Sequence, residues 1–197
     1  MYIPKHFAKK DKNEIAEFIH ANAFGQLLSQ HAGRLCAAHI PFALSGDHSH
    51  IYGHLARQNP QWQDIDNQEV LIILQGPHGY VSPTWYSGPG VPTWNYQALH
   101  IYGRCSVFED TKRLRALVDD MSRRYEADIE TPWVGDFKES LLSAIVGVDI
   151  EISDIQCKYK LSQNRSLQDR QQVIAALRHK GRTALAKVMQ MEVDRDG

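Results

Sequence analysis

Apolar positions change their spacing along this chain, and the changes mark predicted helices and strands. Asp11 and Glu14 form a capping-box pattern ahead of apolar residues at helical spacing, which predicts a first helix ending at about Ala23. Runs rich in β-branched and aromatic residues follow, separated by turn residues, at 26–30, 35–44, 51–56, 69–75, 80–86 and 94–108. Five or six short strands at this spacing predict an antiparallel sheet or a small barrel.

Helical spacing returns after the last of these strands. Leu114, Leu117 and Met121 predict an amphipathic helix, and a second helix is expected after Gly135. Residues 148–159 alternate like a strand. From Ser166 the pattern predicts a helix, a turn and another helix. The whole reads as an α+β chain with a β-barrel at its centre.

Composition narrows the class of protein. The 197 residues are 43% hydrophobic and 23% charged, as in ordinary globular domains. No secretory signal is recognised, and the longest apolar run, 70–74, is too short to span a bilayer. Three isolated cysteines (Cys36, Cys105 and Cys157) fit neither a disulfide framework nor a zinc cluster. We therefore expect a cytoplasmic protein with no membrane partner.

Charge is uneven along the chain. The segment from Lys158 onward carries nine Lys/Arg and four Asp/Glu, a net charge of +5, which leaves −6 for the remainder. A basic tail of this kind fits a solvated helix face as well as it fits a nucleic-acid surface. DNA therefore stays an open candidate partner.

Polar side chains gather at the end of the strand 51–56. His54, Arg57 and Asn59 lie together there, ahead of Pro60. An arginine at a strand end is well placed for bidentate contact with a phosphate. The alternative is an ordinary strand terminus with a surface arginine.

A Pro-Thr-Trp triplet occurs twice, at 83–85 and 92–94, on either side of a Gly/Pro turn. Two indoles and several hydroxyls therefore converge where adjacent strands meet. A flat aromatic cofactor needs such apolar faces with a few directed hydrogen bonds at its edge. The alternative is that both tryptophans anchor a core or a dimer interface.

Other chemistries find little support. His48, His50 and His54 share one strand face but have no carboxylate or thiol partner at a metal-ligand spacing, so no metal site is expected. The chain has no Gly-x-Ser-x-Gly elbow, no Gly-x-Gly-x-x-Gly after a strand and no Walker-type lysine loop. A hydrolase, a dinucleotide-binding domain and an NTPase are therefore disfavoured.

Several phrases of this sequence, taken in order, resemble the PaiB family of FMN-binding negative transcriptional regulators. They are the opening 1–7, His39-Ile40-Pro41-Phe42, the segment 53–60, Gly76-Pro77, 80–86, 91–96 and 160–165. The resemblance spans almost the entire chain. It implies a split β-barrel related to pyridoxamine-phosphate-oxidase-like barrels, with flanking helices and a C-terminal helical hairpin.

The resemblance also implies FMN as cofactor, a homodimer with FMN at the subunit interface, and negative regulation of transcription. We expect residues 1–165 to form the split-barrel FMN-binding domain and residues 166–197 to form a helical extension packed on it. The alternative function on the same fold is an FMN-dependent oxidoreductase, either a flavin reductase or a small-molecule oxidase. A binding module without flavin is a third option, and no residue is singled out as catalytic.

The family-like positions imply a set of flavin-binding residues. Arg57 would pair with the FMN phosphate, with His54 and Asn59 beside it. The hydroxyls of Ser82 and Thr84 would donate to phosphate or ribityl oxygens. The positions expected to frame the isoalloxazine, or to close over it, are Trp85, Thr93, Trp94, Asn95, Lys160, Ser162, Gln163 and Asn164.

Overall fold

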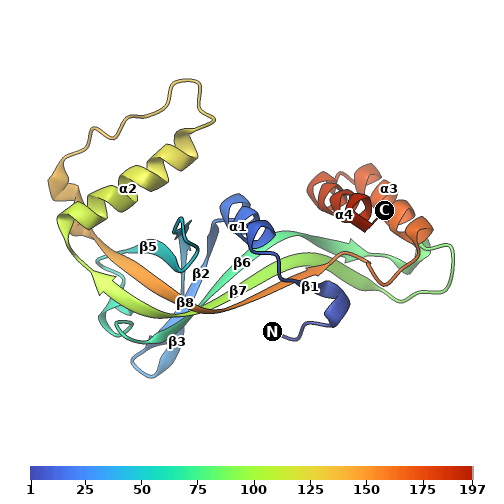
Figure 1. Cartoon of the computed structure of the whole chain (residues 1–197), viewed down its shortest axis with the longest axis horizontal. Helices are drawn as coiled ribbons and strands as arrows, with labels where there is room; N and C mark the ends of the chain where they lie inside the picture. The colour runs from blue at the N-terminus through green and yellow to red at the C-terminus, as the bar shows by residue number, and fades with distance from the viewer. Residues whose placement is uncertain (197) are drawn as a thin grey trace. The chain divides into compact units, whose positions relative to one another are not determined.

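The computed structural model describes residues 1–196 and contains an antiparallel eight-stranded sheet with accompanying helices (Figure 1). The strands are β1 Ala8–Lys9, β2 Phe24–His31, β3 Arg34–Pro41, β4 Ala43–Leu44, β5 His50–Ala56, β6 Glu69–Val81, β7 Thr93–Phe108 and β8 Ile145–Lys160. The helices are α1 Lys12–Ala21, α2 Thr111–Glu126, α3 Leu167–His179 and α4 Thr183–Asp196, with 3-10 turns η1 Lys5–Phe7, η2 Pro60–Gln63, η3 Pro83–Trp85 and η4 Glu139–Ala144. The predicted α+β class and the C-terminal helical pair are confirmed.

The sheet is an open path rather than a closed ring. Its strand order is β3-β2-β6-β7-β8-β5-β4, and β1 pairs with β8. The strand β5 nevertheless passes close to β3, because a Cβ at Gly53 would lie 2.9 Å from the Ile40 side chain and 3.3 Å from the Pro41 carbonyl. A side chain at position 53 would therefore push the two strands apart. This curled, unclosed sheet is the split barrel that the sequence predicts.

By their contacts the residues fall into two compact units. Unit 1 comprises Met1–Ile15, Gln75–His100 and the chain from Gln156 onward, and unit 2 comprises Ala16–Leu74 and Ile101–Ile155. In unit 1 the helix α3 contacts α4 and η3, and Leu185 of α4 lies against Gly79 of β6. The predicted division at residue 165 stays a prediction.

The long strand β6 differs from the two strands expected at 69–75 and 80–86. It runs without a break through Gly76-Pro77, because its pairing with β2 covers only Leu71–Ile73 and Pro77 lies beyond that segment. The chain then enters η3 instead of a strand. The Ser82 hydroxyl accepts a hydrogen bond from the Thr84 amide, and Pro83 occupies the first turn position, where its missing N–H costs nothing.

One part of the apolar core of unit 2 lies under α2. Leu114, Leu117 and Met121 are buried on one face of that helix and pack against Ala43 and Phe108. The helix expected after Gly135 is instead the 3-10 turn η4. Leu142 alone is buried there while Leu141 faces solvent, so a single buried side chain anchors this short segment. Of the helices formed by residues 1–196, none is long and apolar enough to cross a membrane.

Candidate functional site

Unit 1 contains a pocket of about 700 Å³ that gathers four of the predicted flavin-binding residues. Small-molecule sites in proteins usually measure about 300–1,000 Å³. Its lining combines aromatic rings, hydroxyls and two cations, namely His78, Gly79, Tyr80, Ser82, Thr84, Trp85, Trp94, Leu177, Lys180 and Arg182. We call it the hairpin pocket, because the last three of these residues belong to the α3–α4 helical hairpin.

Two hydroxyls lie side by side in the hairpin pocket. The Ser82 and Thr84 side-chain oxygens are 2.8 Å apart and hydrogen-bonded. The short turn η3 fixes this pair, because the Ser82 oxygen also accepts from the Thr84 amide at 3.3 Å. The preceding strand β6 delivers Ser82 to this position. One hydroxyl donates to the other, so the pair keeps one hydrogen to donate to a ligand, together with the lone pairs of both oxygens.

Aromatic rings form another part of the lining. The His78 and Trp94 rings are stacked with centroids 6.5 Å apart, and Tyr80 meets Trp94 edge-on at 6.4 Å. Trp94 and Tyr80 remain 55% and 46% exposed, although side chains of this size are usually buried. These exposed faces are available to stack on a planar ligand.

The cations Lys180 and Arg182 come from the turn between α3 and α4. Gly181 lies between them with φ +70°, the left-handed conformation in which glycine commonly ends a helix. The Arg182 amide donates to the Leu177 carbonyl at 2.8 Å, and this bond closes the turn. Within residues 1–196 neither Lys180 nor Arg182 has a side-chain hydrogen bond or ion pair. In the sequence alone both residues are recognisable only as members of a basic tail.

Lys160 binds the backbone segment that carries Trp94 of the hairpin pocket. Its ammonium donates to the Thr93 hydroxyl at 2.5 Å and to the Trp94 carbonyl at 2.6 Å. Burial lowers the pKa of Lys160, and the nearby charge of Lys158 lowers it further. These two bonds tie the end of β8 to the start of β7, so they fix the backbone that carries the Trp94 ring.

Asn95 and Ser162 form a buried polar pair instead of pointing at open space. They are 0% and 4% exposed, and the Asn95 amide donates to the Ser162 hydroxyl at 2.8 Å and to the Met189 sulfur at 3.3 Å. Gln163 also bonds within unit 1, donating to the Tyr159 carbonyl at 2.6 Å. Asn164 is exposed. These contacts join β7 and the turn after β8 to α4.

The other predicted residues, His54, Arg57 and Asn59, belong to unit 2. The Arg57 guanidinium donates to the Ser143 carbonyl at 2.6 Å, to the Ile145 carbonyl at 3.2 Å and to the Glu109 carboxylate at 2.6 Å. It is therefore engaged within its own unit.

The two neighbours of Arg57 differ from each other. The Asn59 oxygen accepts from the Gln61 amide at 3.0 Å and caps η2. Burial lowers the pKa of His54, and its Nδ1 atom has no hydrogen-bond partner among residues 1–196. His54 therefore presents a buried side-chain nitrogen without a partner among residues 1–196.

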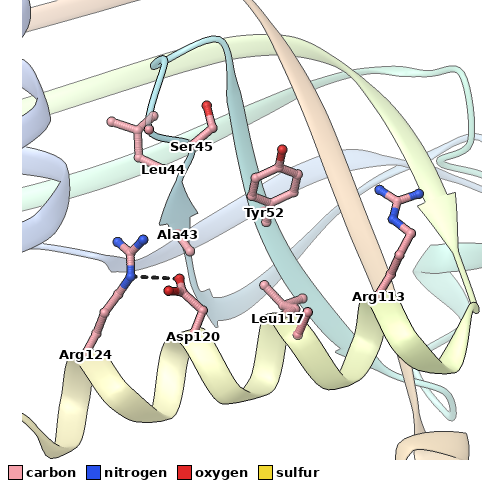
Figure 2. A pocket seen from close by; sticks show the side chains of 10 residues that line it. Ala43, Leu44, Ser45, Tyr52, Arg113, Leu117, Asp120 and Arg124 are labelled. Atoms are coloured by element: carbon pink, nitrogen blue, oxygen red, sulfur yellow. Dashed lines mark hydrogen bonds and ion pairs between the residues drawn. The ribbon is translucent and has the colours of Figure 1, made fainter.

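A second pocket, of about 450 Å³, lies in unit 2 between α2 and the β4–β5 hairpin (Figure 2). We call it the α2 pocket. It also carries two cations, but both have acidic partners: Arg124 bonds Asp120 at 2.9 Å, and Arg113 bonds Asp149 at 2.9 Å. Among the described residues, no cluster of three or more His, Cys, Asp or Glu side chains could hold a metal ion.

Most basic residues of the tail are occupied inside unit 1. The Arg165 guanidinium lies 4.4 Å from the Tyr86 ring and donates to the Pro89 carbonyl at 3.3 Å. Arg170 is only 5% exposed, and Arg178 donates to the Gln190 side chain at 3.4 Å. Lys187 is exposed. The tail therefore does not present all its positive charge to a polyanion.

Sequence comparison finds a family and a close relative. Residues 1–154 match the family model described as "Putative FMN-binding domain". The chain is 42% identical over 187 residues to the Bacillus subtilis protein named "Protease synthase and sporulation protein PAI 2", covering 91% of this chain and 90% of the relative.

Solved structures with the same fold include two flavin-containing proteins. One is the FAD and haem binding protein from Mycobacterium smegmatis, with a TM-score of 0.61 and 14% identity over 85% of this chain and 78% of that chain. The other is the flavocytochrome Anf3 from Azotobacter vinelandii, with a TM-score of 0.58 and 15% identity over 80% and 72%. At these identities the likeness concerns the fold alone.

Proposed function

This chain belongs to the FMN-binding domain family, with FMN as its cofactor, and we propose that it acts in the cytoplasm as an FMN-binding negative regulator of transcription. The support for the regulatory role is the 42% identity, over nine tenths of both chains, to a relative whose name refers to protease synthesis and sporulation. The family match itself concerns the cofactor and leaves the regulatory role to be tested.

We propose the hairpin pocket as the site of the flavin. The observation that carries this proposal is the convergence of Ser82, Thr84, Trp85 and Trp94, each expected from the sequence alone, on one pocket of suitable size. An isoalloxazine is flat and largely apolar, which suits the exposed faces of Trp94 and Tyr80. When bound, FMN would supply electron-transfer chemistry, while the chain would supply binding and orientation.

Asn95, Ser162 and Lys160 would act on the flavin indirectly. Their hydrogen bonds join β7, β8 and α4 behind the pocket, so they would hold Trp94 in place instead of contacting the ligand. Thr93 and Gln163 belong to the same supporting set. For His54, the partnerless Nδ1 atom is compatible with the ligand contact expected from the family resemblance.

We also propose that the protein works as a homodimer with FMN at the subunit interface. Trp94 and Tyr80 leave about half of their surfaces exposed beside the pocket, so a second subunit could cover the flavin and bury both rings. Size-exclusion chromatography with light scattering tests this assembly. A monomer that retains FMN at micromolar concentration would contradict it.

The visible spectrum of the purified protein is the first test of the cofactor. We expect oxidised-flavin absorbance and release of about one FMN per chain on denaturation, or uptake of added FMN by a colourless preparation. A protein that neither contains nor takes up FMN would contradict the proposed function.

Two further assays separate a regulator from an oxidoreductase. Steady turnover of NADH or NADPH by the FMN-loaded protein would favour the enzyme. Sequence-dependent DNA binding whose affinity falls steeply with salt would favour a regulator that contacts DNA directly. Binding with a flat salt response would count against direct contact.

A further inference from the structure

We infer that the α3–α4 turn supplies the phosphate-binding cations of the hairpin pocket, and that Lys180 and Arg182 make the pocket select FMN over riboflavin. This inference rests on the proposed function, since it assumes that the flavin occupies this pocket. Both residues lie beyond the segment 1–154 that the family model matches. It therefore assigns a binding role to a part of the chain that family membership does not describe.

Lys180 and Arg182 lack side-chain partners among the described residues. Other arginines of unit 1 already have defined contacts, such as Arg165 on the Tyr86 ring and Arg195 with the Glu14 carboxylate. Lys180 and Arg182 have no acceptor among residues 1–196, yet both line the pocket. No carboxylate is among the lining residues, so positive charge there is uncompensated. An anionic ligand group is the natural complement of such a site.

The two cations share the pocket with a pair of hydroxyl groups. The hydroxyls of Ser82 and Thr84 line the same pocket, and the hydrogen that their mutual bond leaves free can be donated to an anion. A phosphate monoester carries a charge of about −1.5 to −2 at pH 7 and has three strong acceptor oxygens. Two cations and the free hydrogen of the hydroxyl pair match its charge and its acceptors. Riboflavin has the same ring system but lacks this group.

The turn between α3 and α4 is held in place by hydrogen bonds and by packing on β6. Backbone hydrogen bonds fix the turn around Gly181, and the Ala186 amide of α4 donates to the Arg182 carbonyl at 3.1 Å. Leu185 of α4 packs on β6, since a Cβ at Gly79 would lie 3.0 Å from its side chain. At the other end of the hairpin, the Asp169 carboxylate accepts from the Ser87 amide at 2.9 Å. A fixed turn loses little conformational freedom when its side chains bind a ligand.

The test is the affinity of the full-length protein for FMN and for riboflavin, measured by flavin fluorescence titration. In the K180A/R182A double variant we expect the Kd for FMN to rise about 10- to 100-fold while the Kd for riboflavin stays within about twofold, because charge-assisted hydrogen bonds are lost only with the phosphate. Inorganic phosphate should compete with FMN in the wild-type protein and not in the variant.

Lys187→Ala is the matched control, because Lys187 is an exposed lysine of α4 that does not line the pocket. It should leave both affinities unchanged. The K180Q/R182Q variant keeps polar, hydrogen-bonding side chains without the charge and should behave like the alanine pair. If wild-type protein binds FMN and the double variant keeps the same preference for FMN over riboflavin, the inference is overturned while the proposed function stands. If wild-type protein does not bind FMN, the proposed function itself fails.

Discussion

The hairpin pocket of unit 1 and the α2 pocket of unit 2 each carry two cationic side chains, but their electrostatics differ. In the α2 pocket Arg124 is bonded to Asp120 (Figure 2), and Arg113 is bonded to Asp149, so each cation has an acidic partner. In the hairpin pocket Lys180 and Arg182 have no such partner among the described residues. A count of Lys and Arg would rank the two pockets alike. The difference is whether each cation has an acidic partner. Paired cations, as in the α2 pocket, form a structural ion-pair network, whereas the unpaired cations of the hairpin pocket suit an anionic ligand.

Arg57 belongs with the paired cations of unit 2. Its guanidinium has a carboxylate partner and two carbonyl acceptors, which satisfy most of its donors. Contact with a phosphate would require it to give up some of these bonds. The cations of the hairpin pocket need give up none.

The largest expected effect comes from supplying the missing carboxylate. Thr84→Asp would place a negative charge in the hairpin pocket beside Lys180 and Arg182, making it resemble the α2 pocket. We expect the Kd for FMN to rise on the order of 100-fold, because the aspartate would both repel the phosphate and compete for the cations. Thr84→Asn is the uncharged control of the same shape. Equal affinities of the Asp and Asn variants for FMN would contradict the comparison.

The second effect concerns Arg57 and should appear in stability. Arg57→Ala removes hydrogen bonds to the Ser143 and Ile145 carbonyls and a half-exposed ion pair with Glu109. We expect a loss of about 1–2 kcal/mol in the free energy of unfolding, measured in urea, with little contribution from the exposed ion pair. Retention of FMN by this variant would fit the pairing seen in unit 2. Loss of FMN with unchanged stability would restore Arg57 as the phosphate ligand.

Local patterns in the sequence predicted most of the fold. The Asp11 cap is present, with its carboxylate accepting from the Glu14 amide at 2.9 Å, and the amphipathic pattern of α2 matches its buried face. The errors arose where a few residues decide between local structures. Gly76-Pro77 was expected to break β6, and the apolar residues after Gly135 were expected to form a full helix.

The candidate site was less predictable, because it depends on contacts between distant segments. The hydroxyls and tryptophans at 82–85 and 94 were found because they lie close together in the sequence. Lys180 and Arg182 were missed as pocket residues, since nothing local links the α3–α4 turn to β6. One signal was available: two cations flank a helix-ending glycine with no acidic residue in the turn. The pairing of Arg57 with Glu109 had no local signal at all.

A third prediction concerns the backbone that carries the two unpaired cations. Gly181→Ala forces a side chain into the left-handed region at φ +70°, where it meets no steric obstacle but is strained by its own backbone. We expect a loss of about 1 kcal/mol of stability in urea unfolding. FMN affinity should fall several-fold if the turn shifts Lys180 and Arg182, while riboflavin affinity should not change. Gly33→Ala, at φ +73° in a turn of unit 2, is the control for strain alone.

The smallest expected effect concerns His20, which lies beside Arg124 of the α2 pocket. Burial lowers the pKa of His20, and the positive charges of Arg124 and His48 lower it further, against an opposing influence from Asp120. The Arg124 guanidinium donates to the His20 Nδ1 atom at 3.2 Å, a bond that requires this nitrogen to be unprotonated. As pH falls through the ordinary histidine value of 6.5, the unfolded chain therefore takes up a proton at this position before the folded chain does. The folded state loses stability in that range and below it.

His20→Gln should reduce the drop in melting temperature between pH 7.5 and 5.5, whereas His179→Gln, a change at an exposed histidine of α3, should not. If the melting temperature of the wild type and of His20→Gln falls by the same amount, Arg124 does not measurably oppose protonation of His20.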